Sequence, residues 1–118
     1  MAVDASTLRL GSVVRVRLDP VKGREIGKER PCIVHQRIVH PQGTVTVLPL
    51  TTTAPPKPYP FMAKLPKGVG GLKRDSWVKC QQVRTVAVSR LTKHVGNLKP
   101  TELAPVTRAL LFHLGVGD

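Results

Sequence analysis

The chain has 118 residues, with 19 lysines and arginines against 7 aspartates and glutamates, which gives a formal net charge of +12. This charge attracts an anionic partner, which is a nucleic acid, an acidic protein segment or an anionic membrane surface. No apolar run approaches the roughly 20 residues of a membrane-spanning helix, and the N-terminus lacks the pattern of a secretory signal, so we expect a cytoplasmic protein.

The first half of the chain predicts β-strands. Apolar and basic residues alternate with a period of two over residues 12–18, which indicates a half-buried strand. A polar, charged stretch, Leu18 to Val34, follows and overlaps the next apolar run, PCIVHQRIV. The turn at residues 41–43 (PQG) and the run TVTVLPL then complete a β-hairpin rich in β-branched residues.

Shorter strands and loops are expected over residues 51–88. The stretch TTTAPPKPYP contains four prolines and predicts a surface loop, because proline cannot donate to a central strand ladder. We expect a short strand over residues 61–65, a glycine-containing turn over 67–73, a strand over 76–83 and a shorter apolar stretch through residue 88. Residues 88–92 are also compatible with a helical turn.

Only the C-terminal region has helical periodicity. Apolar residues lie three, four and four positions apart, at Leu103, Val106, Leu110 and Leu114. Thr101 is the expected N-cap, Gly115 the expected end, and Pro105 would remove only the first intrahelical hydrogen bond. The sequence therefore predicts one mainly β domain over residues 1–118, a small antiparallel sheet of five to seven strands curled into a barrel, with a C-terminal α-helix and an N-terminal arm over residues 1–10.

Several kinds of catalytic site are disfavoured by the sequence. There is no phosphate-binding P-loop, GxSxG or HExxH pattern, and the four histidines lack metal-ligand spacing, so we expect no metal and no cofactor. Cys32 and Cys80 lie within apolar runs without a CxxC spacing, and we expect both to be buried, reduced thiols.

Basic residues are concentrated in three predicted loops. They are Lys22, Arg24, Lys28 and Arg30 in the first loop, Lys57 beside Tyr59 and Phe61 in the proline loop, and Lys73 and Arg74 before the third apolar run. If the loops gather at one end of the barrel, they form a cationic groove for a phosphate backbone, with the aromatic rings stacking on one or two unpaired bases. The alternative is a set of scattered, solvated charges.

Seven short strings in a fixed order resemble the MazF/PemK toxins, which are endoribonucleases of type II toxin–antitoxin systems. They are G-x-V-x-x-V-x-L-D-P-x-x-G-x-E, K-x-R-P-C-I-V, L-P-L-T, YPF, RDS, QQVRT and SRL, spread from Gly11 to about Leu114. The resemblance implies a PemK-like, SH3-like barrel, a homodimer and a cognate acidic, MazE-like antitoxin. It also implies metal-independent cleavage of single-stranded mRNA by the ribose 2′-hydroxyl, with a cyclic phosphate product and inhibition of translation and growth.

The resemblance assigns the catalytic positions to Arg30, which precedes the proline of the R-P pair, to Thr51, which ends the L-P-L-T string, and to Glu25 in the first loop. The chemistry agrees, because a guanidinium stays charged and offers forked donors to phosphate oxygens. We expect Arg30 to stabilise charge first, and Thr51 to donate a hydrogen bond to the same oxygens. Glu25 would orient Arg30 or accept a proton.

The remaining candidate residues are expected to bind RNA. They are Lys22, Arg24, Lys28, Lys57, Tyr59, Phe61, Arg74, Lys79 and Gln82. Many family members have an acid where this chain has Gln81, so a participating carboxylate would have to come from Glu25 or Asp75. Lys79 replaces an arginine of some relatives and would contact phosphate with less geometric specificity.

Two other functions fit the same residues. A barrel of this class could grip RNA without cutting it, with an affinity that falls steeply with salt. A toxin of the same superfamily could instead poison DNA gyrase, although the Arg30 and Thr51 motifs argue against that.

Overall fold

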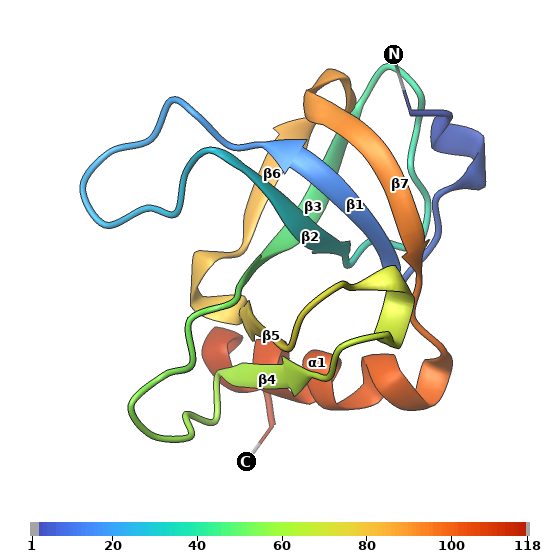
Figure 1. The fold of residues 1–118 in the computed structure, drawn as a ribbon. Helices are drawn as coiled ribbons and strands as arrows, with labels where there is room; N and C mark the ends of the chain where they lie inside the picture. The colour runs from blue at the N-terminus through green and yellow to red at the C-terminus, as the bar shows by residue number, and fades with distance from the viewer. Residues whose placement is uncertain (1–2, 118) are drawn as a thin grey trace.

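The computed structural model describes residues 3–117 and has seven β-strands and one α-helix (Figure 1). The strands are β1 (Ser12–Arg17), β2 (Glu29–Val34), β3 (Thr44–Thr51), β4 (Met62–Leu65), β5 (Ser76–Lys79), β6 (Arg84–Ala87) and β7 (Leu91–Asn97). The helix is α1 (Pro100–Leu114), and four 3₁₀ turns are η1 (Ala5–Thr7), η2 (Val69–Gly71), η3 (Cys80–Gln82) and η4 (Val88–Arg90). The predicted mainly β fold with a C-terminal helix is confirmed.

The long strand β3 joins two arms of one antiparallel sheet. Its first half pairs with β6 and its middle, Val47 to Pro49, pairs with β2. The sheet continues from β2 through β1 to β7, and these strands form the curled arm. Its last two residues pair instead with β5, which pairs with β4 and forms the short arm. No ladder joins β6 to β7 among residues 3–117, so the predicted barrel is curled but not closed by strand pairing.

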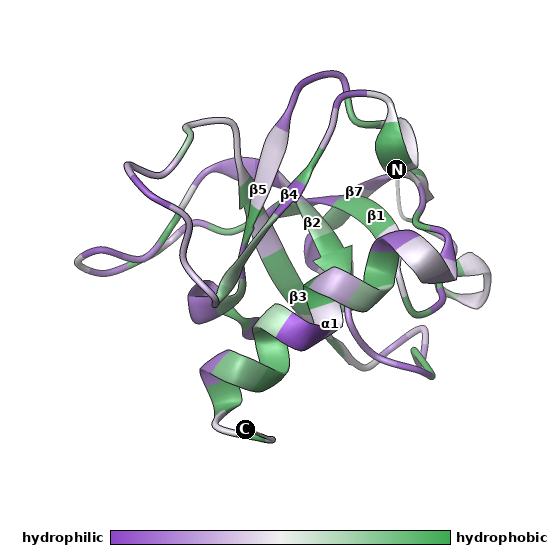
Figure 2. Cartoon of the chain, turned by 90° about the horizontal axis from the view of Figure 1, so that it is seen from below, coloured by the Kyte–Doolittle hydropathy of each residue, from purple (hydrophilic) through white to green (hydrophobic). Residues whose placement is uncertain are grey.

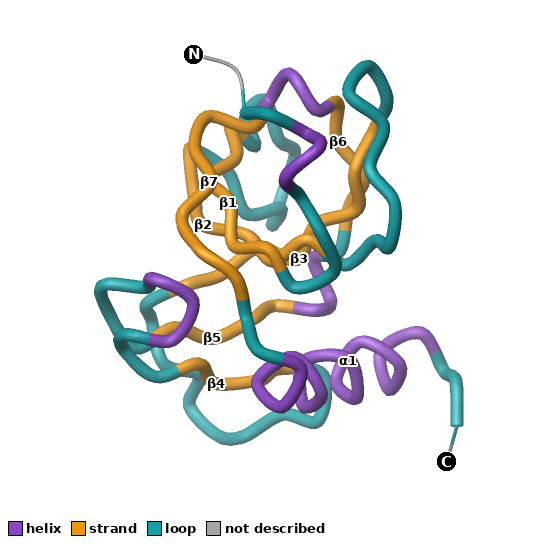
Figure 3. Tube along the Cα trace, turned by 90° about the vertical axis from the view of Figure 1, so that its right-hand side faces the viewer, coloured by secondary structure: helices purple, strands orange, loops and turns teal. Residues whose placement is uncertain are grey.

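The central strands are buried on both faces. One core fills the curled arm and contains Val14, Val16, Cys32, Val34 and Val47. The other core lies on the opposite face, where α1 covers the short arm (Figure 3). The helix contributes the buried residues Leu103, Val106, Ala109 and Leu110 to this second core. The strand predicted over residues 12–18 is therefore buried on both faces at Val13 and Val14 rather than half-buried.

The N-terminal segment packs against the curled arm. Asp4 caps η1 through a hydrogen bond from the Ser6 amide, and Ala5 and Leu8 are buried in the first core. None of the helices described between residues 3 and 117 is long and apolar enough to cross a membrane.

The helix begins two residues earlier than the sequence predicts. Lys99, not Thr101, is the N-cap, Pro100 is the first helical residue, and the Glu102 carboxylate accepts a hydrogen bond from the Lys99 amide at 2.7 Å. Pro105 consequently lies in the second turn, where its missing N–H leaves the Thr101 carbonyl without its helical donor. That carbonyl belongs to an exposed residue, so water can replace the lost donor.

Other boundaries also differ from the prediction. The strand expected over residues 76–83 ends at Lys79 because η3 interrupts it, and residues 91–97 form the unpredicted strand β7. The helical turn expected over residues 88–92 is present as η4, and the helix ends at Gly115 as predicted. Leu114 was expected on the buried helix face and is 55% exposed.

Candidate active site on the face opposite the helix

Thr51 and the outward residues of β5 form one surface. Along β5, Ser76 and Val78 are buried while Trp77 and Lys79 are half-buried, because successive side chains point to opposite faces. Thr51 pairs with Trp77 in the ladder, and directly paired residues share a face. The surface that carries Thr51, Trp77 and Lys79 is therefore the one that faces away from α1.

Arg30 lies on β2 at the edge of this surface. The β2–β3 ladder ends where Cys32 pairs with Pro49, and the strands separate beyond this pair. Arg30 and Thr51 each lie two residues beyond it on their own strands, so both point to the face that Cys32 and Pro49 share. The Arg30 Nε donates a hydrogen bond to the Gly27 carbonyl at 2.8 Å, which fixes the guanidinium against its own loop. Within residues 3–117 no hydrogen bond engages its two terminal nitrogens, so their donors are available to a ligand.

Thr51 presents a hydroxyl whose proton is available. Its Oγ1 accepts a hydrogen bond from the Thr53 amide at 3.2 Å, which holds the hydroxyl at the end of β3. A hydroxyl that accepts from the backbone in this way can still donate its own proton. Arg30 and Thr51 together can thus offer charged and neutral donors to one anionic group.

The loop between β1 and β2, residues 18–28, is fastened to η3. The Ile26 amide donates to Gln82 Oε1 at 3.3 Å, and Gln82 Nε2 donates to the Arg24 carbonyl at 3.3 Å. Arg84 Nη1 also donates to the Leu18 carbonyl at 3.1 Å. Gln82, predicted to bind RNA, is therefore engaged with this loop through both side-chain atoms, and its position supports the loop that holds Arg30.

A glycine allows the same loop to close on itself. A Cβ at Gly27 would overlap the Asp19 carboxylate and touch the Val21 side chain. A side chain at this position would therefore force residue 27 away from residues 19–21 on the other side of the loop. The Gly27 carbonyl is also the acceptor for Arg30. The close approach at Gly27 therefore contributes directly to the placement of the guanidinium.

Glu25 does not contact Arg30 in this structure. Its carboxylate accepts a hydrogen bond from the Lys22 amide, and its own amide donates to the Lys22 carbonyl at 3.1 Å, so the pair closes a turn at the loop tip. Lys22, Arg24 and Lys28 are exposed on the same loop. The predicted role of Glu25 as the group that orients Arg30 has no counterpart in these contacts.

A small hollow lies behind the loop tip. Arg24 and Glu25 line it together with Gln81, Gln82, Val83 and Arg84. The Gln81 Oε1 is buried and has no hydrogen-bond partner within residues 3–117. A buried acceptor without a partner is costly, so this amide is poised to take a donor from water or from a ligand.

The proline loop, residues 52–61, flanks the other side of the surface. The Tyr59 and Phe61 rings stack on each other with centroids 5.0 Å apart, and Lys57 Nζ lies 5.7 Å from the Tyr59 centroid. In Figure 1 this loop and the 18–28 loop protrude on the same side of the molecule. The structure therefore brings two of the three predicted cationic loops to one side, with Thr51 at the base of one and Arg30 at the base of the other.

The third cationic loop lines a separate cleft that also includes Thr52, at the start of the proline loop. Arg74 and Lys73 line a cleft with Arg15 and Lys93, and this cleft does not include the 18–28 loop. Three further basic or aromatic residues were not among the candidates from the sequence: Trp77 beside Thr51, Arg84 against the 18–28 loop, and Lys93 in the cleft with Lys73 and Arg74. The QVRT string was a signal for Arg84, whereas only the pairing of β7 with β1 reveals Lys93.

The thiols near the site are chemically quiet. Burial raises the pKa of Cys32 and of Cys80 to about 12, and neither residue forms a disulfide. The prediction of two buried, reduced thiols is confirmed. Among residues 3–117, no three His, Cys, Asp or Glu side chains are grouped as metal ligands.

Comparisons with known proteins identify relatives along nearly the whole chain. Residues 9–114 match the family model of the PemK-like, MazF-like toxin of type II toxin–antitoxin systems. The endoribonuclease MazF9 of Mycobacterium tuberculosis is 33% identical over 114 residues, which cover 91% of this chain and 96% of that protein.

Solved structures share the fold. MazF from Deinococcus radiodurans is 26% identical, with a TM-score of 0.76 over 92% of this chain and 97% of that one. An endoribonuclease from a mycobacterial species, solved in complex with its cognate antitoxin, is 18% identical with a TM-score of 0.76, over 95% of this chain and 99% of that one. At 18% identity the second likeness shows the fold alone.

Proposed function

The chain belongs to the PemK-like, MazF-like toxins of type II toxin–antitoxin systems, and from this membership we propose that it is an endoribonuclease that cuts single-stranded mRNA in the cytoplasm and so inhibits translation and growth. We treat residues 1–118 as one toxin domain. The observation that supports the proposal most directly is the placement of Arg30 and Thr51 on one face, each at the base of a cationic loop.

The proposed reaction is an internal transesterification. The ribose 2′-oxygen attacks the adjacent phosphorus, its proton passes to a base, and the bond to the 5′-oxygen of the next nucleotide breaks. The products are a 2′,3′-cyclic phosphate and a 5′-hydroxyl, and the leaving oxygen takes a proton. No oxidant, reductant or cofactor is needed for this balance.

Arg30 and Thr51 are the proposed hydrogen-bond donors to the scissile phosphate. The free Arg30 nitrogens stabilise charge that develops on the phosphate oxygens, and the Thr51 hydroxyl donates to the same group. Lys79 on the same face adds a positive charge without forked geometry. Because Gln81 cannot ionise, Glu25 is the proposed acceptor of the 2′-hydroxyl proton, and in the structure its carboxylate accepts a hydrogen bond from the Lys22 amide.

The other predicted RNA contacts divide between the two loops. Lys22, Arg24 and Lys28 would neutralise phosphates along the 18–28 loop. Tyr59 and Phe61 already stack on each other and are both half-buried, and we propose that this pair provides one stacking surface for an unpaired base. Lys57, which lies over Tyr59, would contact the phosphate of that nucleotide.

Product chemistry tests the proposal. Purified protein in excess EDTA is incubated with a long unpaired RNA, and we expect cuts at a few short sequences, with 5′-hydroxyl ends that polynucleotide kinase labels without prior phosphatase treatment. A single 2′-deoxy substitution at a mapped cut should prevent that cut alone. Arg30→Ala should abolish cutting, and Arg37→Ala, which removes an exposed arginine outside the site, should not.

Other results would contradict the proposal. Cutting that needs added metal would exclude the metal-independent route, and undiminished cutting by Arg30→Ala would remove Arg30 from the mechanism. RNA recovered intact from a tight complex would favour the non-cleaving binding module, and trapping of gyrase on DNA would favour the gyrase poison.

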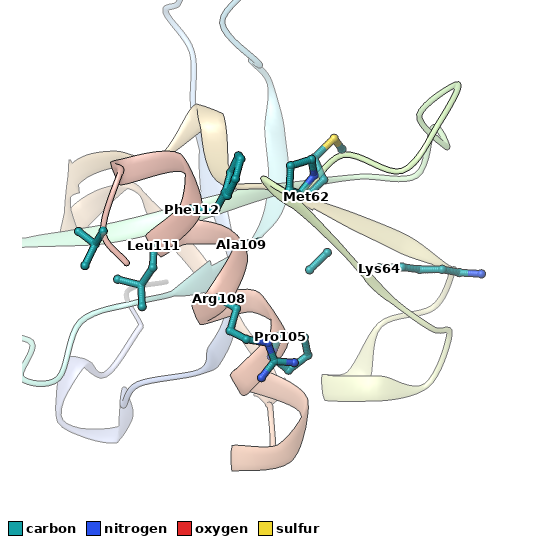
Figure 4. A pocket seen from close by; sticks show the side chains of 10 residues that line it. Met62, Lys64, Pro105, Arg108, Ala109, Leu111 and Phe112 are labelled. Carbon is teal, nitrogen blue, oxygen red and sulfur yellow. The ribbon is translucent and has the colours of Figure 1, made fainter. Parts of the chain in front are cut away.

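We propose that the active form is a homodimer that forms through α1. The last turns of α1 are mostly hydrophobic (Figure 2), and this end of the chain lines a hollow that α1 shares with β4 (Figure 4). Leu111, Phe112 and Leu114 of α1 and Val116 just beyond it are 38–57% exposed. Two copies that meet through this patch bury it twice in a symmetric interface. Light scattering should report a dimer, Phe112→Ser should weaken it, and Ile38→Ser, on a residue that is 80% exposed elsewhere, should not.

A cognate antitoxin is the proposed regulator. Membership of a toxin family of type II toxin–antitoxin systems motivates this partner, and the charge of +12 favours an acidic, flexible segment that folds over the cationic loops. Such a complex should weaken with added salt and should compete with RNA. A tight partner that leaves RNA cutting unchanged would contradict this mode of inhibition.

A further inference from the structure

A second basic cleft lies between the two arms of the sheet. It has a volume of about 350 Å³, and β1, β2 and β7 form one wall while the segment around residues 71–76 forms the other. We call it the inter-arm cleft. Its lining residues are Arg15, Pro31, Thr52, Gly71, Leu72, Lys73, Arg74, Ser76, Lys93 and Val95.

The inter-arm cleft carries a concentrated positive charge. Four of its lining residues are basic and none is acidic: Arg15, Lys73, Arg74 and Lys93. The adjacent Glu29 carboxylate pairs with Arg15 Nε at 2.8 Å, and both of these side chains are more than a third exposed. Within residues 3–117, Lys73, Arg74 and Lys93 have no ion-pair partner within 4.0 Å. The cleft therefore keeps an uncompensated charge that favours an anionic ligand.

The floor of the cleft is apolar. Leu72 is 5% exposed, and Pro31 and Val95 are half-buried beside it. Gly71 comes so close to the Val95 carbonyl that a Cβ there would lie 2.8 Å from that oxygen, so only glycine allows the two walls to meet at this depth. An apolar floor between cationic walls suits a ligand that has a flat apolar part joined to an anionic one, as a nucleotide does.

The cleft begins next to the candidate catalytic residues. Two of its lining residues, Pro31 and Thr52, directly follow Arg30 and Thr51 in the chain. The strands β2 and β3 stop pairing after Cys32 and Pro49, and the cleft lies where these strands separate. Pro31 shares its face with its ladder partner Arg15 and so points away from Arg30, because side chains alternate along a strand. An RNA strand whose scissile phosphate lies between Arg30 and Thr51 would therefore reach the cleft by passing round the point where β2 and β3 separate.

We propose that the inter-arm cleft binds a nucleotide of the RNA that flanks the scissile bond, with its phosphate among the four cations and its base on the apolar floor. This inference rests on the proposed ribonuclease function. An acidic peptide is a poorer occupant because its carboxylate side chains would meet the cations but would bring no planar ring to the floor that Leu72, Pro31 and Val95 form. Arg74 supplies the forked donors that match phosphate oxygens, whereas Arg15 already donates from Nε and Nη2 to Glu29.

Binding to an uncleavable RNA tests the proposal without depending on catalysis. The probes are a short RNA around a mapped cut site, with 2′-deoxyribose at the attacking position, and the same RNA extended by single nucleotides on either side. The variant is Lys73→Ala/Lys93→Ala. The control, Arg9→Ala/Arg37→Ala, removes two charges from a different hollow, which Arg9, Arg37 and Lys99 line.

The expected loss is specific to one extension. The cleft variant should bind the RNA extended on one side about tenfold more weakly, as expected for a lost charge-assisted contact, and should bind the short RNA with unchanged affinity. The slope of the logarithm of its binding constant against the logarithm of the salt concentration should be shallower by about 1.4, because two contacts to a single strand are lost. Circular dichroism of both variants establishes that each is folded.

Three outcomes would overturn the inference. They are equal losses for the short and extended RNAs, equal losses in the control variant, and a loss of acidic-peptide binding with RNA binding unchanged. Failure of the wild type to cut unmodified RNA would count against the proposed function, whereas the comparison of RNA lengths would still report on the cleft.

Discussion

The Gln82 side chain accepts a hydrogen bond from the Ile26 amide at 3.3 Å, although 56 residues separate the two in the chain. Its Nε2 also donates to the Arg24 carbonyl, so one side chain of η3 holds two backbone positions of the 18–28 loop. That loop in turn provides the Gly27 carbonyl that fixes Arg30. The position of the candidate catalytic arginine thus depends on a residue that need not touch the RNA.

Replacing Gln82 should mainly increase the mobility of the 18–28 loop. Gln82→Ala removes hydrogen bonds worth about 1 kcal/mol, so the Ile26 amide should exchange with solvent about fivefold faster. Cutting should slow because Arg30 is held less firmly. Gln42→Ala, at an exposed turn, is the control. A variant that binds RNA more weakly while Ile26 exchange stays unchanged would show that Gln82 contacts RNA directly.

The Thr51 hydroxyl should contribute to the chemical step more than to binding. Thr51→Val keeps the shape and removes the donor, and we expect single-turnover cutting to slow by at least about 100-fold with little change in KM. Thr51→Ser should retain most activity. Thr44→Val, at the exposed start of β3, is the matched control. A rise in KM with kcat unchanged would instead assign Thr51 to substrate binding.

The sequence predicts the fold well where the hydrophobic pattern is strong. The alternation over residues 12–18 and the β-branched run of β3 identify two central strands. The strand β7 was missed because LTKHVGN contains two basic residues and a glycine, and its pairing with β1 shifts register twice. Tertiary pairing, not local propensity, makes that segment a strand.

The sequence proposes the residues of the candidate site, but it does not predict how the fold groups them. The family motifs single out Arg30 and Thr51, and the strand register then sets them on one face. The sequence placed Arg74 in the same groove as the other cations, whereas it lines the inter-arm cleft with Lys93. That grouping depends on how the two arms of the sheet diverge from β3. The charge and the spacing of residues along the chain do not predict this divergence.

The loss of stability on truncating an isoleucine should depend on how deeply its side chain is buried. Ile33 is fully buried between the arms and α1, so Ile33→Ala should lower the free energy of unfolding by about 2–5 kcal/mol. Ile38 is 80% exposed, and Ile38→Ala should change it by less than about 0.5 kcal/mol. Urea titrations of the two variants at equal protein concentration make the comparison. Similar losses for both would contradict the packing described for Ile33.

His35 should make the stability of the protein depend on pH. Its Nε2 lies 2.8 Å from the Thr107 hydroxyl of α1, so the residue joins the end of β2 to the helix. Burial lowers the pKa of His35 below its ordinary value of 6.5. Between the folded and unfolded pKa values the unfolded chain binds more protons, and the free energy of unfolding therefore falls as the pH drops below about 6.5.

The steepness of the decline in the free energy of unfolding with pH tests whether His35 is the group responsible. One histidine contributes at most about 1.4 kcal/mol per pH unit, and its contribution levels off below the folded pKa. Urea midpoints measured from pH 7.5 to pH 5 should show a shallower decline for His35→Gln than for the wild type, because glutamine has no proton to bind. His40→Gln, at an exposed turn, should leave the decline unchanged. An identical decline in His35→Gln would mean that the protonation of His35 does not cause the loss of stability.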